Sequence, residues 1–276
     1  MVEEKQIDLN TDDKRRRTGT AASVKGTTEG GGRAAGKPSR LSQVTSGETS
    51  RIDTGIGELN RVLAGSGARI SDFDFREPGI GKSTIIIQAA AHIAASKGTV
   101  LYVSGEESEE QIKIRADRVC DKLPEDLYIL AETNIDVIAE ACQQLNPVFL
   151  IIDSIQTMYT SDIESAPGSV SQVRTCGNEL MRIGKMHGIP VFIVAHVTKS
   201  GDLAGPRIVE HMVDCVLSFT GDRSHEMRIL RAQKNRFGTT SEIGAFEMAQ
   251  QGLMEIENLS GTLLEEMEKD SEGAVV

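Results

Sequence analysis

The sequence predicts an α/β fold with a mainly parallel central sheet flanked by helices. Four short apolar runs, each suited to a strand that is covered on both faces, begin at positions 100, 127, 148 and 191. Amphipathic stretches of helical periodicity separate these runs, as in repeated strand–helix–strand units. A glycine-rich string followed by a helix-compatible segment at residues 78–90 adds a predicted phosphate-binding turn.

The order of elements is predicted from the same patterns. Ordered structure is expected to begin near Arg51, with apolar residues at helical spacing over residues 56–63. Beyond the four apolar runs, residues 213–219, 227–231 and 244–248 are predicted to extend the sheet with partly antiparallel strands.

Composition divides the 276 residues into a central domain, residues 49–258, and two tails. Residues 1–48 are rich in Gly, Ser, Thr and basic residues, and they predict a disordered tail, because so few apolar groups cannot offset the entropy of ordering. Residues 259–276 predict an acidic tail. The formal net charge of −11 argues against nonspecific wrapping of nucleic acid and leaves room for local binding.

Several classes of protein are excluded by the pattern of apolar residues and cysteines. No apolar run approaches the roughly 18 residues of a membrane span, and no export signal is recognisable, so a cytosolic protein without membrane contact is expected. The four cysteines are scattered singly without a CxxC pair, which predicts reduced, buried thiols and no zinc site.

The string at residues 78–84 is the strongest chemical signal and predicts nucleotide binding. Lys82 is expected to reach the β- and γ-phosphates of ATP, and Ser83 to bind Mg²⁺. The predicted nucleotide-binding residues are Pro78, Gly79, Ile80, Gly81, Lys82, Ser83 and Thr84. The first glycine of the usual pattern is replaced by Arg76, which can crowd the turn.

The segment before this turn is unusually polar for a central strand. Asp72 and Asp74 would point into a covered face of the sheet, at a cost of several kcal/mol unless they are paired or protonated. Two explanations stay open at this point: the strand is displaced from the sheet, or the stretch is a sequence anomaly that weakens ATP binding.

Two other strand ends carry side chains that suit phosphoryl transfer. The apolar run at 148–152 ends in Asp153, a carboxylate expected to bind Mg²⁺ together with Ser83. The run at 191–194 leads to His196, which is placed to sense the γ-phosphate, since ligands of open α/β sheets lie at the carboxyl ends of strands. Taken alone, a strand-end aspartate or a single histidine is as often structural.

Glu106 and Glu107 follow the strand predicted at residues 100–103 and are candidates for the catalytic base. A carboxylate here can orient and deprotonate the water that attacks the γ-phosphate. The alternative is that Glu107, Glu109 and Glu110 only stabilise the N-terminus of the next helix. The choice between Glu106 and Glu107 stays open.

Together these motifs resemble the RadA (Sms) family of DNA repair proteins, which are RecA-superfamily P-loop ATPases. The resemblance covers residues 51–258 and rests on the strings at residues 51–59, 78–84, 102–108, 152–157, 166–173, 204–207 and 234–238. The last string, KNRFG, is far more specific than a P-loop.

The resemblance implies a RecA-like ATPase domain that binds ATP and Mg²⁺ and forms a homo-oligomeric ring, a hexamer. It implies binding of single-stranded or branched DNA and branch migration together with the RecA recombinase, in the bacterial cytosol or a plant organelle. Lys234 and Arg236 would then lie at a subunit boundary, within reach of a neighbour's γ-phosphate. Without the family, a basic turn explains them equally well. Residues 161–170 and 198–207 are candidate DNA-facing loops, because their Gly and Pro residues suit mobile loops.

Family members usually begin with a four-cysteine zinc finger and end with a Lon-protease-like domain, and both are missing here. Residues 259–276 are therefore expected to be the stub of a missing C-terminal domain. A catalytically impaired oligomerisation or interaction subunit of the same fold is the second hypothesis, favoured by Arg76 and by Asp72 and Asp74. A KaiC-type ATPase also carries a Glu-Glu pair after its second strand, and the KNRFG string argues against it.

Overall fold

The computed structural model describes residues 40, 42, 53–63, 70–75, 80–196, 205–221 and 227–256. The chain divides into two compact units, Met1–Gly47 and Glu48–Val276, and every element named below lies in the second. The predictions for the tails at 1–48 and 259–276 fall outside the described residues, apart from Arg40 and Ser42.

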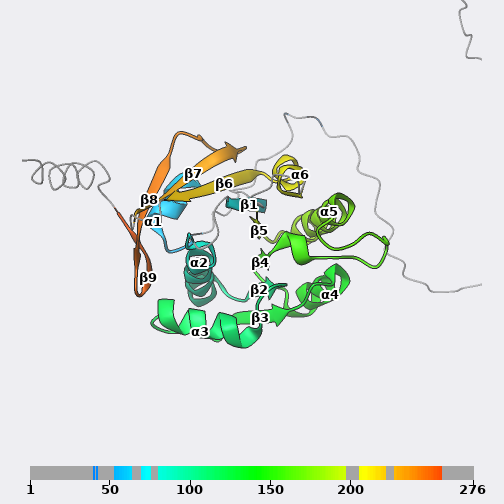
Figure 1. The fold of residues 1–276 in the computed structure, drawn as a ribbon, viewed down its shortest axis with the longest axis horizontal. Helices are drawn as coiled ribbons and strands as arrows, with labels where there is room; N and C mark the ends of the chain where they lie inside the picture. Colours follow the sequence, from blue (N-terminus) through cyan, green and yellow to red (C-terminus); the bar gives the residue numbers. More distant parts are fainter. Residues whose placement is uncertain are drawn as a thin grey trace, which may run out of the picture. The chain divides into compact units, whose positions relative to one another are not determined.

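The described residues form a nine-stranded sheet with helices on both faces (Figure 1). The strands are β1 (Ile70–Phe75), β2 (Val100–Ser104), β3 (Leu127–Ala131), β4 (Phe149–Asp153), β5 (Val191–His196), β6 (Cys215–Gly221), β7 (Met227–Asn235), β8 (Ile243–Ala249) and β9 (Gly252–Glu255). The helices are α1 (Gly57–Val62), α2 (Lys82–Lys97), α3 (Glu109–Val119), α4 (Ile135–Leu145), α5 (Val170–His187), α6 (Gly205–Met212) and the short 3-10 helix η2 (Ile155–Thr157).

The sheet is parallel on one side and antiparallel on the other. Its strand order is β3-β2-β4-β5-β1-β6-β7-β8-β9, with parallel pairing from β3 through β6 and antiparallel pairing from β6 through β9. This confirms the predicted mainly parallel α/β sheet and its antiparallel extension. The carboxyl ends of β2, β4 and β5 consequently meet at one edge, where ligands of such sheets bind.

The polar segment before the P-loop is a central strand. β1 pairs in parallel with β5 and with β6, so the hypothesis that this strand is displaced from the sheet is wrong. Its backbone hydrogen bonds to two neighbours hold it in place despite its polar composition. The side chains of Asp72 and Asp74 lie outside the described part of the chain.

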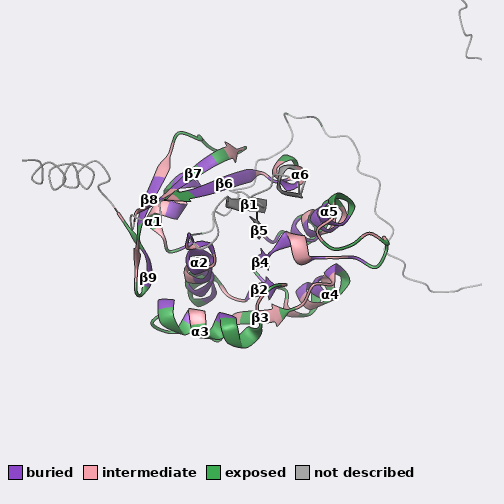
Figure 2. Cartoon of the chain, in the orientation of Figure 1, coloured by how far each residue is buried: buried purple, intermediate pink, exposed green. Residues whose placement is uncertain are grey.

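Two apolar clusters cover the two faces of the sheet, and both are visible as buried stretches in Figure 2. α1, α2 and α3 contribute to the first cluster, which packs on residues such as Tyr102, Phe149 and Ile151. α4, α5 and α6 contribute to the second, which packs on residues such as Leu101, Val103 and Leu150. The alternation of β2 and β4 residues between the clusters explains why both strands are apolar throughout.

Neither α6 nor β9 is predicted by the sequence pattern. The predicted loop at 198–207 is wrong at its end, because α6 begins at Gly205 and includes Pro206 in its first turn. Proline is tolerated there, since its missing N–H would have no helical partner in any case. β9 continues the sheet by antiparallel pairing with β8.

The cysteines are mostly buried, as their scattered positions among apolar residues predict. Cys142, Cys176 and Cys215 are buried and form no disulfide, and Cys120 is half-buried. Burial raises the pKa of Cys142 and of Cys176 to about 11, so both keep their protons at neutral pH. In the parts of the chain that the structure describes, no helix has the length and apolar character needed to cross a bilayer.

Candidate nucleotide-binding site

The phosphate-binding turn leads directly into α2. Gly81 precedes the helix with φ of 106°, a left-handed conformation that side chains rarely adopt. A Cβ at this position would lie 2.6 Å from Cε of Met248, the end of a flexible side chain, so it is the backbone conformation that requires glycine. Lys82, the first helical residue, is only 6% exposed. Of the predicted turn, Pro78, Gly79 and the neighbouring Arg76 lie outside the described residues.

Ser83 and Asp153 come together as predicted, across the contact between α2 and the end of β4. The Ser83 hydroxyl donates a hydrogen bond of 3.3 Å to Oδ2 of Asp153, a carboxylate that is 8% exposed. Mg²⁺ prefers oxygen ligands and is usually held by one or two carboxylates together with substrate phosphates. A hydroxyl and a carboxylate side by side at the start of α2 therefore fit this ion. Among the described residues, no three acidic, His or Cys side chains are arranged so that they could hold a metal ion by themselves.

A buried tyrosine also contacts Asp153. The Tyr102 hydroxyl donates a hydrogen bond of 2.6 Å to the same Oδ2. Burial, followed by the negative charge of Asp153, raises the pKa of Tyr102 well above its ordinary value. The phenol consequently stays protonated and acts as a donor.

The two glutamates after β2 point to different partners. Oε1 of Glu106 accepts a hydrogen bond of 2.5 Å from the hydroxyl of Ser154, the residue that follows Asp153. Glu107 instead forms an ion pair with Arg115 of α3. The structure thus brings Glu106 to the end of β4, beside the proposed Mg²⁺ ligands, and holds Glu107 against a helix.

Gly105 lets the loop after β2 approach the segment after β4. A Cβ on Gly105 would lie 2.0 Å from Oγ1 of Thr157 in η2, far inside any real contact distance. The backbone N–H of Gly105 donates to the carbonyl oxygen of Asp153 over 2.8 Å. Only glycine permits this approach, which sets Glu106 next to Ser154.

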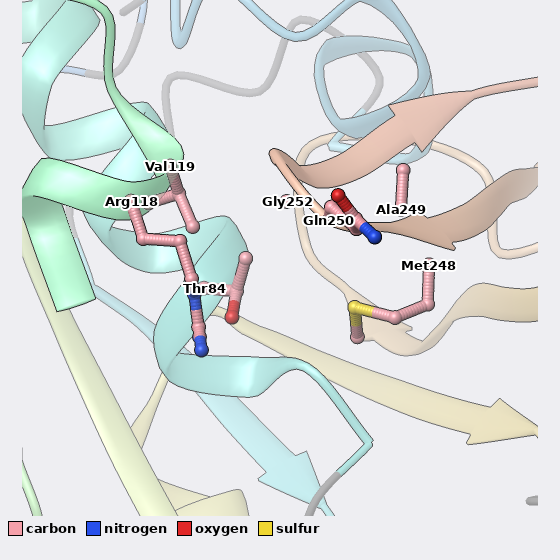
Figure 3. A pocket seen from close by; sticks show the side chains of 7 residues that line it. All are labelled: Thr84, Arg118, Val119, Met248, Ala249, Gln250 and Gly252. Atoms are coloured by element: carbon pink, nitrogen blue, oxygen red, sulfur yellow. The ribbon is translucent and has the colours of Figure 1, made fainter.

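A pocket of about 540 Å³ opens beside the start of α2 (Figure 3). It is lined by Thr84, Arg118, Val119, Met248, Ala249, Gln250 and Gly252. Figure 3 shows Thr84 and Arg118 on the helical side and the β8–β9 turn on the other. Gln88 of α2 ties this turn to the helix, since its Oε1 accepts from N of Leu253 at 3.1 Å and its Nε2 donates to the carbonyl of Leu253 at 3.3 Å.

Apart from Thr84, the residues that line the pocket were not predicted. They come from two segments that are distant in the sequence, the end of a helix and a hairpin turn, and each looks ordinary by itself. The one local signal is Gly252, whose φ of 120° marks the turn. A signal of that kind predicts a hairpin and says nothing about a ligand.

Comparison with known proteins decides among the candidate families. A family model described as an AAA domain matches residues 75–202. The DNA repair protein RadA of Bacillus subtilis is 52% identical over 241 residues, which are 87% of this chain and 52% of that protein. RadA of Listeria monocytogenes is 49% identical over 247 residues, 87% of this chain and 53% of that protein.

The chain is related to the RadA family. It spans about half the length of the curated RadA relatives that it matches. Solved structures confirm a RecA-like ATPase fold: a DnaB-like replicative helicase superposes with a TM-score of 0.62 at 15% identity, over 76% of this chain and 63% of that one. A KaiC-like protein from Pyrococcus horikoshii superposes with a TM-score of 0.60 at 18% identity, over 75% of this chain and 98% of that one.

The RadA resemblance draws attention to Lys234 and Arg236 in the KNRFG string, and the structure separates their environments. Nζ of Lys234 donates to the carbonyl oxygens of Glu210 and Val213, at 2.8 and 2.7 Å. These carbonyls belong to the end of α6 and the residue after it, so Lys234 caps a helix of its own chain. Burial, and then the charge of Arg236, lowers the pKa of Lys234.

Arg236 is more exposed than Lys234. Its Nη1 lies 3.1 Å from Oδ1 of Asp214, and its side chain is 53% exposed. An exposed ion pair of this kind contributes little to stability. Of the two cations in the string, Arg236 is therefore the one that is more available to a neighbouring molecule.

Replacing Lys234 by methionine is expected to lower the free energy of unfolding by about 1–3 kcal/mol, because two partly buried carbonyls lose a charged donor. Arg236→Met is the matched control and is expected to cost about 0–1 kcal/mol. Urea unfolding followed by circular dichroism measures both. Equal losses for the two variants would show that Lys234 does not cap α6 in solution.

His196 is the last residue of β5, and its side chain lies outside the described part of the structure. β5 pairs in parallel with β4, Asp153 opposite Val194, so the carboxyl ends of the two strands share one edge of the sheet. This backbone position agrees with the predicted sensor and leaves the role itself a prediction.

The candidate DNA-facing loop at 161–170 is tied to α5 by the side chain of Gln172. The buried Gln172 of α5 donates to the carbonyls of Thr160, Ile163 and Ser165 and accepts from N of Thr160, all within 3.3 Å. These hydrogen bonds do not suit a mobile loop, and Asp162 and Glu164 give it negative charge. The loop at 198–207 contains Lys199 and Arg207, whose side chains are outside the described residues.

Proposed function

We propose that this chain is the ATPase core of a DNA-remodelling protein in recombinational repair. ATP hydrolysis would be coupled to binding of single-stranded DNA and to branch migration. The observation that carries the proposal is the hydrogen bond between Ser83 at the start of α2 and Asp153 at the end of β4, with Glu106 bound to the adjacent Ser154. It is supported by 52% identity to a RadA protein over 87% of the chain.

Each polar group of the site has a proposed task in ATP hydrolysis. Lys82 and the N–H groups at the start of α2 bind the phosphates, because a helix N-terminus favours negative charge. Ser83 and Asp153 would hold Mg²⁺, which neutralises charge on the β- and γ-phosphates when it is bound. Glu106 would take the proton of the attacking water, since its carboxylate accepts a hydrogen bond from Ser154, the residue that follows Asp153.

The pocket beside Thr84 is proposed to take the adenine and ribose. Its volume of about 540 Å³ lies within the range of small-molecule sites. Arg118 projects a planar guanidinium into its lining, and such a group stacks well on an aromatic base. Met248, from the β8–β9 hairpin, offers apolar surface on the other side.

Assembly and partners are part of the same proposal. A homo-oligomeric ring, a hexamer as the RadA resemblance implies, would let exposed Arg236 reach the nucleotide of a neighbouring subunit. His196 would sense the γ-phosphate from the end of β5. Single-stranded or branched DNA and the RecA recombinase are the proposed partners, and the bacterial cytosol or a plant organelle is the proposed compartment.

The test is the rate of ATP hydrolysis by the purified chain with and without single-stranded DNA. We expect Mg²⁺-dependent turnover that rises when DNA is added. If the rate of ATP hydrolysis is the same with and without DNA, the coupling to DNA is wrong and the chain is an ATPase only. Absence of both nucleotide binding and turnover would overturn the proposal.

The second candidate is a catalytically impaired oligomerisation or interaction subunit, and Arg76 favours it. An arginine in place of the first P-loop glycine can crowd the phosphate-binding turn. Arg76→Gly separates the two candidates in the same assay. Hydrolysis that appears only in Arg76→Gly supports the impaired subunit, and equal hydrolysis in both forms supports the active ATPase.

A further inference from the structure

A polar group lies in the middle of the apolar sheet, where nothing in the packing requires it. Tyr102 is 1% exposed and belongs to a strand whose five residues are all buried. Its ring lies in the same apolar cluster as Phe149 and Ile151 of β4, and a phenylalanine would fill that space equally well. A buried hydroxyl costs free energy unless it is hydrogen-bonded, so the group that accepts its hydrogen bond should explain why a tyrosine stands here.

That partner is the carboxylate proposed to hold Mg²⁺. In the register of the sheet, Tyr102 faces Ile151 and Ser104 faces Asp153, so the phenol reaches diagonally along β4. It arrives at Oδ2 of Asp153 over 2.6 Å, whereas the Ser83 hydroxyl approaches the same oxygen at 3.3 Å. The shorter of these two hydrogen bonds therefore comes from the rigid sheet, and the longer one from the helix that carries the phosphate-binding turn.

We propose that Tyr102 is a positioning residue that orients the Asp153 carboxylate for the Mg²⁺–nucleotide complex. This inference rests on the proposed function. Hydrogen bonds to a ligating carboxylate fix its orientation, and their removal typically lowers metal affinity by about 10-fold to 100-fold. Without the phenol, Asp153 would keep the hydrogen bond with Ser83 and lose the shorter one that ties it to β2.

Tyr102→Phe tests the inference, because it removes one oxygen and keeps the ring. Tyr128→Phe is the matched control: the same atom is deleted from the adjacent strand β3, at a residue that is 43% exposed. A fluorescent ATP analogue is titrated into each protein with Mg²⁺ and with a chelator. The readout is the factor by which Mg²⁺ tightens binding.

We expect this factor to fall about 10-fold in Tyr102→Phe and to stay unchanged in Tyr128→Phe. In the presence of chelator, the affinity for the ATP analogue should be equal in all three proteins. The kcat at saturating Mg²⁺ should be equal as well. The Mg²⁺ concentration that gives half-maximal turnover should rise in Tyr102→Phe alone. The readout is a ratio of two dissociation constants of the same protein, so a reduced folded fraction scales both constants equally and cancels from the ratio.

An unchanged Mg²⁺ factor in Tyr102→Phe would overturn the inference and leave the proposed function intact. A nucleotide that fails to bind to the unaltered chain would overturn the proposed function and the inference with it.

A double-mutant cycle adds a second check: in an Asp153→Ala background, Tyr102→Phe should have no further effect on the factor by which Mg²⁺ tightens binding. A further loss there would mean that Tyr102 acts through packing, against the inference.

Discussion

Lys82→Ala is expected to lower the rate of ATP hydrolysis by about 100-fold to 1,000-fold and to weaken nucleotide binding. Lys82 is the first residue of α2, 6% exposed, and follows a glycine whose φ of 106° turns the chain into the helix. Its ammonium group can reach phosphate oxygens as charge builds up on them. Loss of one such preorganised donor typically lowers turnover by a factor on the order of 100 to 1,000.

The matched control for this variant is Lys97→Ala. Lys97 is the last residue of the same helix and is exposed, about 22 Å from Lys82 at 1.5 Å per residue. Turnover and binding of a fluorescent ATP analogue should be unchanged in this variant. Hydrolysis by Lys82→Ala at the rate of the control would exclude α2 as the phosphate-binding helix.

Glu106→Gln is expected to reduce turnover by about 100-fold to 10,000-fold while nucleotide binding is retained. The amide oxygen of glutamine can still accept the hydrogen bond from Ser154, so the loop after β2 should keep its shape. What is lost is the basic carboxylate that takes the proton of the attacking water. Steady-state hydrolysis and binding of the ATP analogue distinguish a chemical defect from a binding defect.

Glu107→Gln is the natural comparison, since the neighbouring carboxylate is altered in the same way. Glu107 is paired with Arg115 and both side chains are partly exposed, so the ion pair adds modestly to stability. Turnover is expected to change by only a few-fold. A severe loss in Glu107→Gln, with near-normal rates in Glu106→Gln, would assign the base to Glu107.

Most of the parallel sheet could be predicted from the sequence because its strands are covered on both faces. β2, β4 and β5 are apolar at almost every position, since alternate side chains enter the two clusters on opposite faces of the sheet. A covered strand leaves a continuous apolar run, and turn residues mark where it ends. β9 has only four residues, two of them exposed, and leaves no such run.

Local composition was misleading where a residue type occurs in two kinds of structure, such as proline, which is found both in loops and in the first turn of helices. Gly205 and Pro206 suggested a loop, and they begin α6 instead, because proline in a first helical turn gives up no hydrogen bond. The aspartates of β1 suggested a displaced strand, and backbone pairing with β5 and β6 places that strand in the centre of the sheet. Pairing partners are remote in the chain, so composition does not report them.

The sequence by itself determined the helix that follows the glycine-rich string, the strand that ends in Asp153 and the order of most strands and helices. These features depend on neighbouring residues, through glycine conformations, helix periodicity and apolar runs. Only the tertiary structure decided that Glu106, and not Glu107, meets the end of β4, that Tyr102 holds Asp153, and that Arg118 lines a pocket. The first two of these contacts join side chains 48 and 51 residues apart, and distances between such positions are set by sheet pairing and helix packing, which no local pattern encodes.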